Sequence, residues 1–208
     1  MGLFRKYVNQ TRKPTGFLGK MMLLGMNGGH AKLADWGFSH FSAMHVEKAA
    51  DLGCGGGRNV GILLKKYPRA HVTGVDYSAL SVEKSRKHNQ KSIREGRCEI
   101  LQGDVSDLSL PEESYDLATA FETIYFWPGL ETCFAQAAKI LKQGGVFLIC
   151  NESDGVDAVG KKFEEIIDGM HCYTVEEITA ALHSAGFAQV QSDRHPSKPW
   201  ITVTARKA

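Results

Sequence analysis

The stretch "DLGCGGGRN" at residues 51–59 decides the fold class, because a strand pattern ends in it and a helix pattern starts from it. Its glycines at positions 53, 55 and 57 let the backbone turn tightly and approach a ligand closely. The dinucleotide fingerprint G-x-G-x-x-G does not fit, because its third glycine would fall on Arg58 or on Val60. The spacing D-x-G-x-G-x-G therefore predicts a ligand-binding turn of another kind, at the carboxyl end of a first strand.

Short apolar segments alternate with helix patterns along most of the remaining chain. Strands are predicted over residues 48–54, 71–78, 98–105, 115–121 and 146–152, and helices over residues 59–67, 79–96, 130–145 and 174–187. Strands separated by helix-length segments need crossover connections, which predict a parallel sheet covered on both faces. "AQVQSDR" (188–194) and "WITVTARK" (200–207) predict an antiparallel hairpin at one edge. The expected fold is one α/β domain with a doubly wound, Rossmann-like sheet.

Two further carboxylates follow the next two predicted strands. Asp76 ends the second strand, where a carboxylate can accept hydrogen bonds from both hydroxyls of a ribose. Asp104 ends the third strand and can accept from an exocyclic amine such as that of adenine. Each acid alone has an ordinary alternative as a helix cap or a turn residue. Three acids at the ends of successive strands, counting Asp51, favour a nucleoside-containing ligand.

At this point the sequence resembles the class I S-adenosylmethionine-dependent methyltransferases. The resemblance rests on "DLGCGGGRN", "GVDYS", "GDVSDLSLPEESYDL" and "ILKQGGVFLICNE" and runs from about Lys48 through the C-terminal hairpin. The whole chain is also similar to a group of small bacterial methyltransferases whose substrate is unassigned. The resemblance implies a seven-stranded sheet with its last strand antiparallel, S-adenosylmethionine as cofactor, and methyl transfer as the activity.

The same resemblance implies the cofactor site. Asp51, Gly53 and Gly55 would surround the methionine part, Asp76 would hold the ribose, and Asp104 with the backbone of Val105 would hold adenine. The full predicted cofactor set is Asp51, Gly53, Cys54, Gly55, Asn59, Asp76, Tyr77, Asp104, Val105 and Phe121. Residues 46–208 would form the core, and residues 1–45 an N-terminal lid segment, in which "MNGGHAKLADWG" (26–37) looks like a lid helix or turn.

The acceptor pocket is predicted from "TAFETIYFWPG" at residues 119–129. Glu122 and Tyr125 follow the fourth strand directly, and we expect them to be the catalytic pair that orients an acceptor or takes its proton. Candidate substrate contacts come from the lid, from the end of this stretch and from "DGMHCYT" (168–174). They are His30, Trp36, Trp127, His171 and Tyr173. A lone histidine is more often structural, and that alternative stays open for His30 and His171.

The composition of the chain limits the classes of binding partner that are expected. A formal charge of +2 over 208 residues is too small to indicate a nucleic-acid or membrane partner, so a small-molecule acceptor is expected. Five scattered cysteines give no zinc spacing, no metal site is predicted, and a reducing cytoplasm is favoured. The oligomeric state is not indicated.

Two alternatives remain open. The basic arm, with Arg5, Lys6, Arg12, Lys13 and Lys20 and no acid among its first twenty residues, allows an RNA or protein methyltransferase. A non-catalytic sensor that binds S-adenosylmethionine would keep the same glycine turn. The sequence favours an enzyme that methylates oxygen, nitrogen or sulfur of a small molecule.

Overall fold

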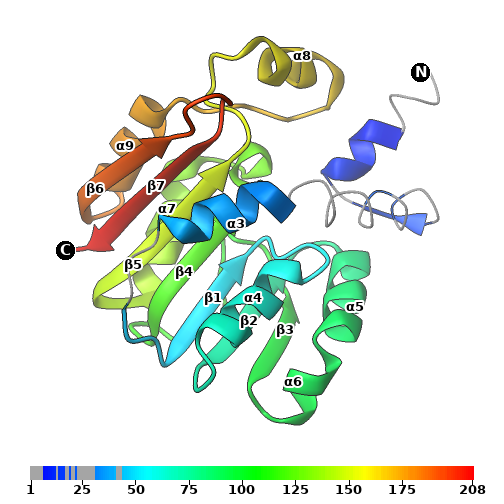
Figure 1. The fold of residues 1–208 in the computed structure, drawn as a ribbon, viewed down its shortest axis with the longest axis vertical. Coiled ribbons are helices and arrows are strands. Elements are labelled where there is room, and N and C mark those ends of the chain that lie inside the picture. Colours follow the sequence, from blue (N-terminus) through cyan, green and yellow to red (C-terminus); the bar gives the residue numbers. More distant parts are fainter. Residues whose placement is uncertain (1–6, 13, 17–18, 20–21, 23–30, 41–43) are drawn as a thin grey trace.

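The computed structural model describes residues 7–12, 14–16, 19, 22, 31–40 and 44–208, and a seven-stranded sheet forms its centre (Figure 1). The strands are β1 (Lys48–Leu52), β2 (His71–Asp76), β3 (Cys98–Gln102), β4 (Tyr115–Phe121), β5 (Leu141–Asn151), β6 (Phe187–Arg194) and β7 (Ile201–Lys207). Their order is β3-β2-β1-β4-β5-β7-β6, with β1 to β5 parallel and β7 antiparallel to both β5 and β6. The predicted doubly wound sheet, its seven strands and its antiparallel last strand are confirmed.

Helices cover both faces of the sheet. They are α3 (Ala31–Ser39), α4 (Arg58–Lys66), α5 (Ala79–His88), α6 (Gln90–Arg94), α7 (Leu130–Ile140), α8 (Ala158–Ile166) and α9 (Val175–Ser184), with short 3-10 turns η1 (Asn9–Thr11) and η2 (Ile124–Phe126). α3, α4 and α5 pack on one face, and α7 and α9 pack on the other. This two-sided cover explains why the side chains on both faces of the central strands are buried.

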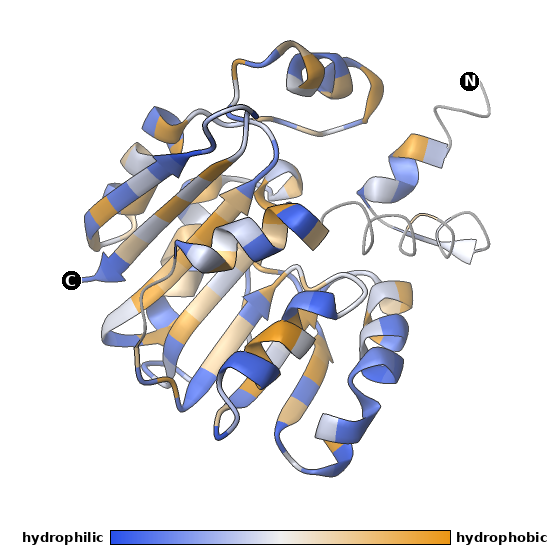
Figure 2. Cartoon of the chain, viewed as in Figure 1, coloured by the Kyte–Doolittle hydropathy of each residue, from blue (hydrophilic) through white to orange (hydrophobic). Residues whose placement is uncertain are grey.

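β4 lies in the middle of the sheet and contributes to both cores. Ala118 and Ala120 pack under α7 and α9, while Leu117 and Phe121 face α3 and α4. All four side chains are buried, in keeping with the uncharged run after Asp116. Hydropathy follows the same layering, with apolar strands inside and polar outer helix faces (Figure 2). The end of β4 is thereby fixed from both sides.

Two element boundaries differ from the sequence-based expectation. The predicted helix over residues 79–96 is two helices, because the Asn89 side chain turns inward and donates to the Gly57 and Ser85 carbonyls at 2.9 and 3.1 Å. The helix predicted over residues 130–145 ends at Ile140, and β5 begins at Leu141. Gly144, with a φ of +70°, lies in a register shift of the strand and not in a helix stop.

The described part of residues 1–45 is packed against the core. In α3, Leu33 is 1 % exposed, and Gly37 lies so close to β5 that an added Cβ would sit 2.6 Å from the Cys150 Sγ. Thr174 and Glu177 form a capping box at the start of α9. His30 lies outside the described residues.

Candidate active site

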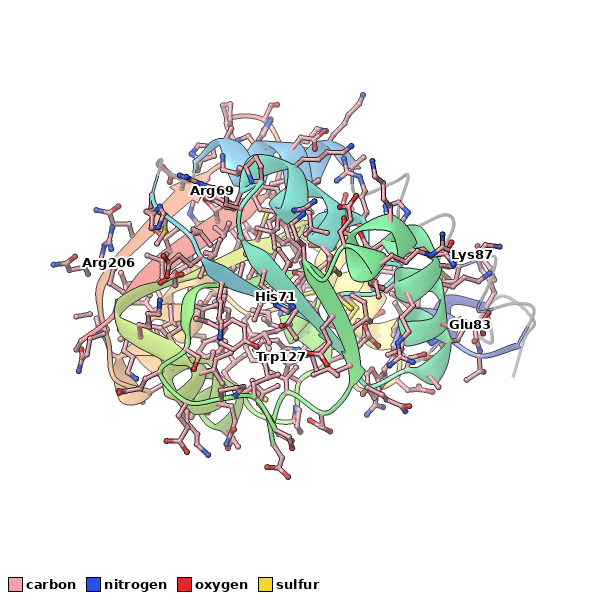
Figure 3. All side chains as sticks on the ribbon, turned by 90° about the horizontal axis from the view of Figure 1, so that it is seen from below. Arg69, His71, Glu83, Lys87, Trp127 and Arg206 are labelled. Atoms are coloured by element: carbon pink, nitrogen blue, oxygen red, sulfur yellow. The ribbon has the colours of Figure 1, made fainter. Side chains whose placement is uncertain are left out.

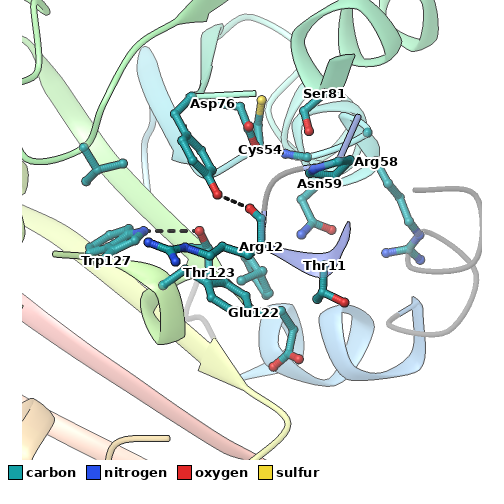
Figure 4. Close-up of a pocket in the computed structure, with 18 of the residues that line it drawn as sticks. Thr11, Arg12, Cys54, Arg58, Asn59, Asp76, Ser81, Glu122, Thr123 and Trp127 are labelled. Carbon is teal, nitrogen blue, oxygen red and sulfur yellow. Dashed lines mark hydrogen bonds between the residues drawn. The ribbon is translucent and has the colours of Figure 1, made fainter. Parts of the chain in front are cut away.

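A cavity of about 230 Å³ opens at the carboxyl ends of β1 to β4, where an α/β sheet of this order binds its ligand (Figure 4). Nine of the ten predicted cofactor residues line it. They are Gly53, Cys54, Gly55, Asn59, Asp76, Tyr77, Asp104, Val105 and Phe121. Glu122 and Trp127 of the predicted acceptor stretch line the same cavity. The structure thus joins the glycine turn and the β4 stretch in one site.

The glycine turn is shaped by two different requirements. Gly53 has a φ of +80°, and a Cβ on it would lie 2.0 Å from the Thr123 Oγ1. Gly55 has a φ of +50°, but a Cβ there would meet no atom within 4 Å. The backbone amides of Gly53 and Cys54 both donate to the Val75 carbonyl, at 2.8 and 2.9 Å. Gly53 is therefore needed for packing, whereas Gly55 leaves open space in which a ligand fits.

Asp76 joins the glycine turn to the second strand. Its Oδ2 accepts from the Gly55 amide and its Oδ1 from the Ser78 amide, both at 2.9 Å. The side chain is 7 % exposed, and this burial raises the pKa of Asp76 above its ordinary value. Asp104 accepts from the Ser106 amide and hydroxyl at 2.8 and 2.7 Å. Both acids thus make local turn hydrogen bonds and also line the cavity.

Asp51 lies behind the glycine turn and does not line the cavity. It is 2 % exposed, and its Oδ1 accepts from the Thr119 hydroxyl at 2.7 Å. Burial raises the pKa of Asp51 to about 7, and the charge of Asp76 acts in the same direction. The Oδ2 atom has no hydrogen-bond partner in the described part of the chain.

Glu122 adopts a backbone conformation that non-glycine residues rarely accept, with a φ of +58° directly after β4. Its Oε1 accepts from the Tyr125 hydroxyl at 3.0 Å and from the Glu152 amide. Burial and, to a smaller extent, the nearby charge of Glu152 raise the pKa of Glu122 to about 8. A strained backbone that presents a carboxyl group to a cavity is typical of a functional position.

Tyr125 supports Glu122 from outside the cavity. It is 3 % exposed and does not line the cavity. Its hydroxyl accepts from the Ser153 amide at 3.1 Å and donates to Glu122. Burial raises the pKa of Tyr125 well above its ordinary value, so the hydroxyl keeps its proton and its role as donor. The geometry makes Tyr125 a positioning residue for Glu122.

Of the predicted substrate contacts, Trp127 lines the cavity and donates from Nε1 to the Thr123 hydroxyl at 3.2 Å. Trp36 packs instead beside Trp200 of the hairpin, with ring centroids 6.0 Å apart. His171 is exposed, and its Nδ1 lies 3.0 Å from the Glu164 Oε1. The centroid of its ring lies 4.4 Å from that of the Tyr173 ring. Trp36, His171 and Tyr173 are not among the cavity-lining residues.

An N-terminal strap, described at Asn9–Arg12 and Pro14, closes one side of the cavity with Thr11, Arg12 and Pro14, and its individual contacts were not predicted from the sequence. The Tyr77 hydroxyl donates to the Arg12 carbonyl, and the Ser78 hydroxyl donates to the Pro14 carbonyl at 3.0 Å (Figure 4). Arg12 Nη1 in turn donates to the Asp168 carbonyl at 3.3 Å. These contacts join residues more than sixty positions apart in the sequence, so no local sequence pattern predicts them.

Further cavity residues come from α3 and the start of α4. Leu33 and Ala34 of α3 line the cavity, as does Arg58, whose Nη2 lies 2.9 Å from the Asp35 Oδ1. Within the described ranges, no group of three or more histidines, cysteines or acids could hold a metal ion. No helix in this part of the chain has the length and apolarity needed to cross a bilayer. All five cysteines are free and buried.

The sheet order, the cavity at its carboxyl edge and the glycine turn define the class I S-adenosylmethionine-dependent methyltransferase fold. Residues 50–149 match the family model described as "Methyltransferase domain". The fold is therefore that of the class I methyltransferases, and the match to the methyltransferase model covers just under half of the chain.

Known proteins similar to the chain are methyltransferases of several kinds. Sterol 24-C-methyltransferase of Gibberella zeae is 28% identical over 166 residues, which cover 74% of this chain and 43% of that protein. Malonyl-[acyl-carrier protein] O-methyltransferase of Priestia megaterium is 32% identical over 105 residues, which cover 50% of this chain and 36% of that protein. The chain thus spans less than half the length of these curated relatives.

Solved structures share the fold over most of the chain. A chain from the complex between the Haloferax volcanii Trm112 methyltransferase activator and a methyltransferase superimposes with a TM-score of 0.83 at 17% identity, covering 100% of this chain and 98% of that one. The S-adenosylmethionine-dependent methyltransferase of Mesorhizobium loti gives a TM-score of 0.69 at 20% identity, with 83% and 97% covered. At these identities the likeness concerns the fold.

Proposed function

We propose that this chain transfers a methyl group from S-adenosylmethionine to a small-molecule acceptor, at an oxygen, nitrogen or sulfur atom. The observation that carries the proposal is the continuity of one cavity, which joins the glycine turn and Asp76 to Glu122. A nucleoside-binding edge and a carboxyl group of raised pKa are thereby held within one enclosed space.

The cofactor fits the first half of the cavity by its donor and acceptor groups. The cofactor supplies an electrophilic methyl group on a positively charged sulfur. Asp76 would hold the ribose hydroxyls, Asp104 and Val105 would hold adenine, and the open space at Gly55 would admit the methionine part. Asp51, behind the turn, would fix the turn itself through Thr119.

Glu122 would orient the acceptor and take its proton. Its Oε1 is held by the Glu152 amide and the Tyr125 hydroxyl, so the carboxyl group keeps one orientation. A pKa of about 8 places the group near the pH at which a general base is effective, a role worth about 10²–10⁴-fold in rate. Phe126 and Trp127 line the same space, exclude water and help position the acceptor, where alignment can contribute ~7–11 kcal/mol.

The names of the similar proteins add one more kind of atom that could receive the methyl group. The Gibberella zeae relative is named for methylation at carbon and the Priestia megaterium relative for methylation at oxygen. Carbon is therefore added to oxygen, nitrogen and sulfur as an accepting atom. A carbon acceptor also releases a proton, which the same carboxylate can take.

The test is an acceptor panel incubated with S-adenosylmethionine that carries a labelled methyl group. The panel holds sterols, isoprenoid diphosphates, fatty acids, amines and thiols, with RNA and protein as further arms. We expect label in at least one small molecule, and a loss of that label with Glu122→Gln. Cofactor binding without transfer to any acceptor would instead support a non-catalytic sensor that binds S-adenosylmethionine. Label in RNA or protein alone would support an RNA or protein methyltransferase.

A further inference from the structure

A second hollow, of about 450 Å³, lies on the outer surface between α4 and the pair α5–α6. We call it the basic groove. Arg58, Lys65, His88, Lys91 and Arg97 line it, and no aspartate or glutamate does. Its remaining lining residues include the polar Asn89 and Ser92. A concave surface with cations and no lining carboxylate is a site for an anion.

The groove lies in a strongly basic part of the chain. Residues 58–97 hold ten lysines and arginines against three acids, although the whole chain carries only +2. One of the three acids is Asp76, which belongs to the cofactor cavity. The other residues of the chain are therefore net acidic, and the near-neutral total conceals a strong asymmetry. Lys87 extends this surface beyond the groove on the outer side of α5 (Figure 3), and the helices α5 and α6 are mostly hydrophilic (Figure 2).

Neighbouring acids neutralise the groove only in part. Asp35 pairs with Arg58 at 2.9 Å, and Glu95 lies 3.5 Å from Arg97 and 3.9 Å from Lys91. Exposed ion pairs of this kind are worth about 0–1 kcal/mol, so an incoming anion can replace the carboxylate at small cost. Lys65 has no ion-pair partner among the described residues. The formal charge of the groove therefore stays positive, with four lysines and arginines against two neighbouring carboxylates.

We propose that the basic groove binds the phosphodiester backbone of a single nucleic-acid strand. Phosphates suit a row of separate cations along a groove, and their binding releases condensed counterions. An acidic protein surface is disfavoured, because protein interfaces depend on buried aromatic or large apolar anchors. The exposed large apolar side chains of the described chain are Val156, Val159 and Phe163. All three lie on or beside α8, away from the groove.

The binding mode follows from the same residues. The groove offers no aromatic ring other than His88 on which a base could stack, so it holds the backbone without reading sequence. Arg58 lines both the basic groove and the cofactor cavity. A bound strand would therefore reach the rim of the cavity. This site is separate from the small-molecule acceptor site proposed above and does not depend on it.

The test measures fluorescence anisotropy of a labelled 16-nucleotide single-stranded RNA between 50 and 300 mM salt, a range in which counterion release is pronounced. The groove variant is Lys65→Gln with Lys91→Gln, two exposed lysines that do not line the cavity. Two lost phosphate contacts should make the slope of log K against log salt about 1.4 shallower, at ~0.7 per contact. The matched control, Lys139→Gln with Lys161→Gln, removes two other exposed helix lysines and should leave the slope unchanged.

Three results would overturn the proposal. The first is no RNA binding by the full chain at 50 mM salt. The second is loss of binding in Arg5→Gln with Lys6→Gln while the groove variant binds normally, which would assign the effect to the N-terminal arm. The third is displacement of the RNA by poly-glutamate of equal charge as efficiently as by unlabelled RNA, which would assign the groove to an acidic protein. Binding of S-adenosylhomocysteine, measured on each variant, shows separately whether the cofactor site is intact.

Discussion

At the level of single residues, Glu122 shows how function is set against stability. A left-handed backbone costs about 1–3 kcal/mol for a non-glycine residue, and burial of the carboxyl group adds a further penalty to its charged form. The surrounding contacts offset both costs, since the Glu152 amide and the Tyr125 hydroxyl hold the same oxygen. Such an arrangement is expected where the side chain acts on a bound molecule.

Glu122→Gln should lower kcat about 10²–10⁴-fold, because the amide keeps the size of the side chain but cannot accept the acceptor's proton. Affinity for S-adenosylhomocysteine should change by less than about twofold, since the substitution resembles the protonated carboxyl group. Turnover and calorimetry on the same preparation check both expectations. Tyr125→Phe is the companion variant and should reduce kcat less, because it only releases the orientation of Glu122. Equal turnover in wild type and Glu122→Gln would remove the catalytic role.

The raised pKa of Glu122 also predicts a pH dependence. The ionised form is the base, so kcat/KM should rise with pH and level off above about 8. Stability should move in the opposite direction. Between pH 4.5 and about 8 the folded chain retains a proton that the unfolded chain has lost, so ionisation destabilises the fold as pH rises. Melting curves across this pH range should show a smaller fall in melting temperature with rising pH for Glu122→Gln than for the wild type. An identical fall in both proteins would contradict the raised pKa of Glu122.

Two glycine substitutions separate packing from ligand space. Gly53→Ala should lower the melting temperature of the free protein, because its Cβ would strike Thr123 and left-handed φ costs ~1–2 kcal/mol. Gly55→Ala carries a similar left-handed cost at its φ of +50° but meets no such contact, so it should destabilise the free protein less than Gly53→Ala and should in addition weaken S-adenosylhomocysteine binding. Melting curves with and without ligand distinguish the two. A larger loss of free-state stability in Gly55→Ala than in Gly53→Ala would contradict this division.

At the level of elements, the cavity is closed by segments that do not belong to the sheet. The N-terminal strap is held by Tyr77 and Ser78 on one side and by Asp168 on the other, through Arg12 and Asn9. Helix α3 adds Leu33 and Ala34 to the wall. We therefore propose that the strap and α3 form the lid over the cofactor, and that the hydrogen bonds of the strap control cofactor release.

Tyr77→Phe should speed the release of S-adenosylhomocysteine, because it removes the hydroxyl that holds the Arg12 carbonyl and keeps the ring. One lost hydrogen bond of about 0.5–1.5 kcal/mol corresponds to roughly a 2- to 10-fold faster off-rate. Stopped-flow displacement measures this rate. Tyr67→Phe is the matched control, since the Tyr67 hydroxyl has no hydrogen-bond partner in the described part of the chain. Equal rates in the two variants would argue against a strap that controls release.

At the level of the whole molecule, the sheet order makes one edge of the domain functional. β1, β2, β3 and β4 are adjacent and parallel, so their carboxyl ends deliver residues from four distant parts of the sequence to one cavity. Residues 58–97 carry ten of the 25 lysines and arginines against three acids, and the rest of the chain is net acidic. The cofactor cavity and the basic groove are both consequences of this arrangement.

Cofactor binding should stabilise the whole domain. A ligand that binds only the folded state adds about 2.7 kcal/mol at one hundred times its Kd, which for a domain of this size raises Tm by roughly 5–10 °C. Scanning calorimetry with S-adenosylhomocysteine measures the shift. Asp76→Asn should lose most of it, because the Gly55 amide and the ribose both depend on that carboxylate. An unchanged Tm in wild type would contradict the cofactor assignment.

The sequence alone determined the architecture, and nine of the ten residues that it predicted to bind the cofactor line one cavity. The spacing of apolar residues and the positions of glycines indicate alternating strands and helices. Gly53, Asp76 and Asp104 follow the ends of strands that any doubly wound sheet brings together. The boundaries at Asn89 and Leu141 were missed, because each depends on a side chain or register contact with a distant element.

Only the tertiary structure decided the rest of the site. In the folded chain Arg12 and Pro14 line the cavity, Tyr125 lies outside it, and Trp36 packs against the hairpin. It also gathered four of the ten lysines and arginines of residues 58–97 along one groove, which the net charge of the chain had concealed. The physical reason is common to all of these cases. Local patterns encode conformation and burial, whereas the meeting of side chains far apart in sequence depends on how the elements pack.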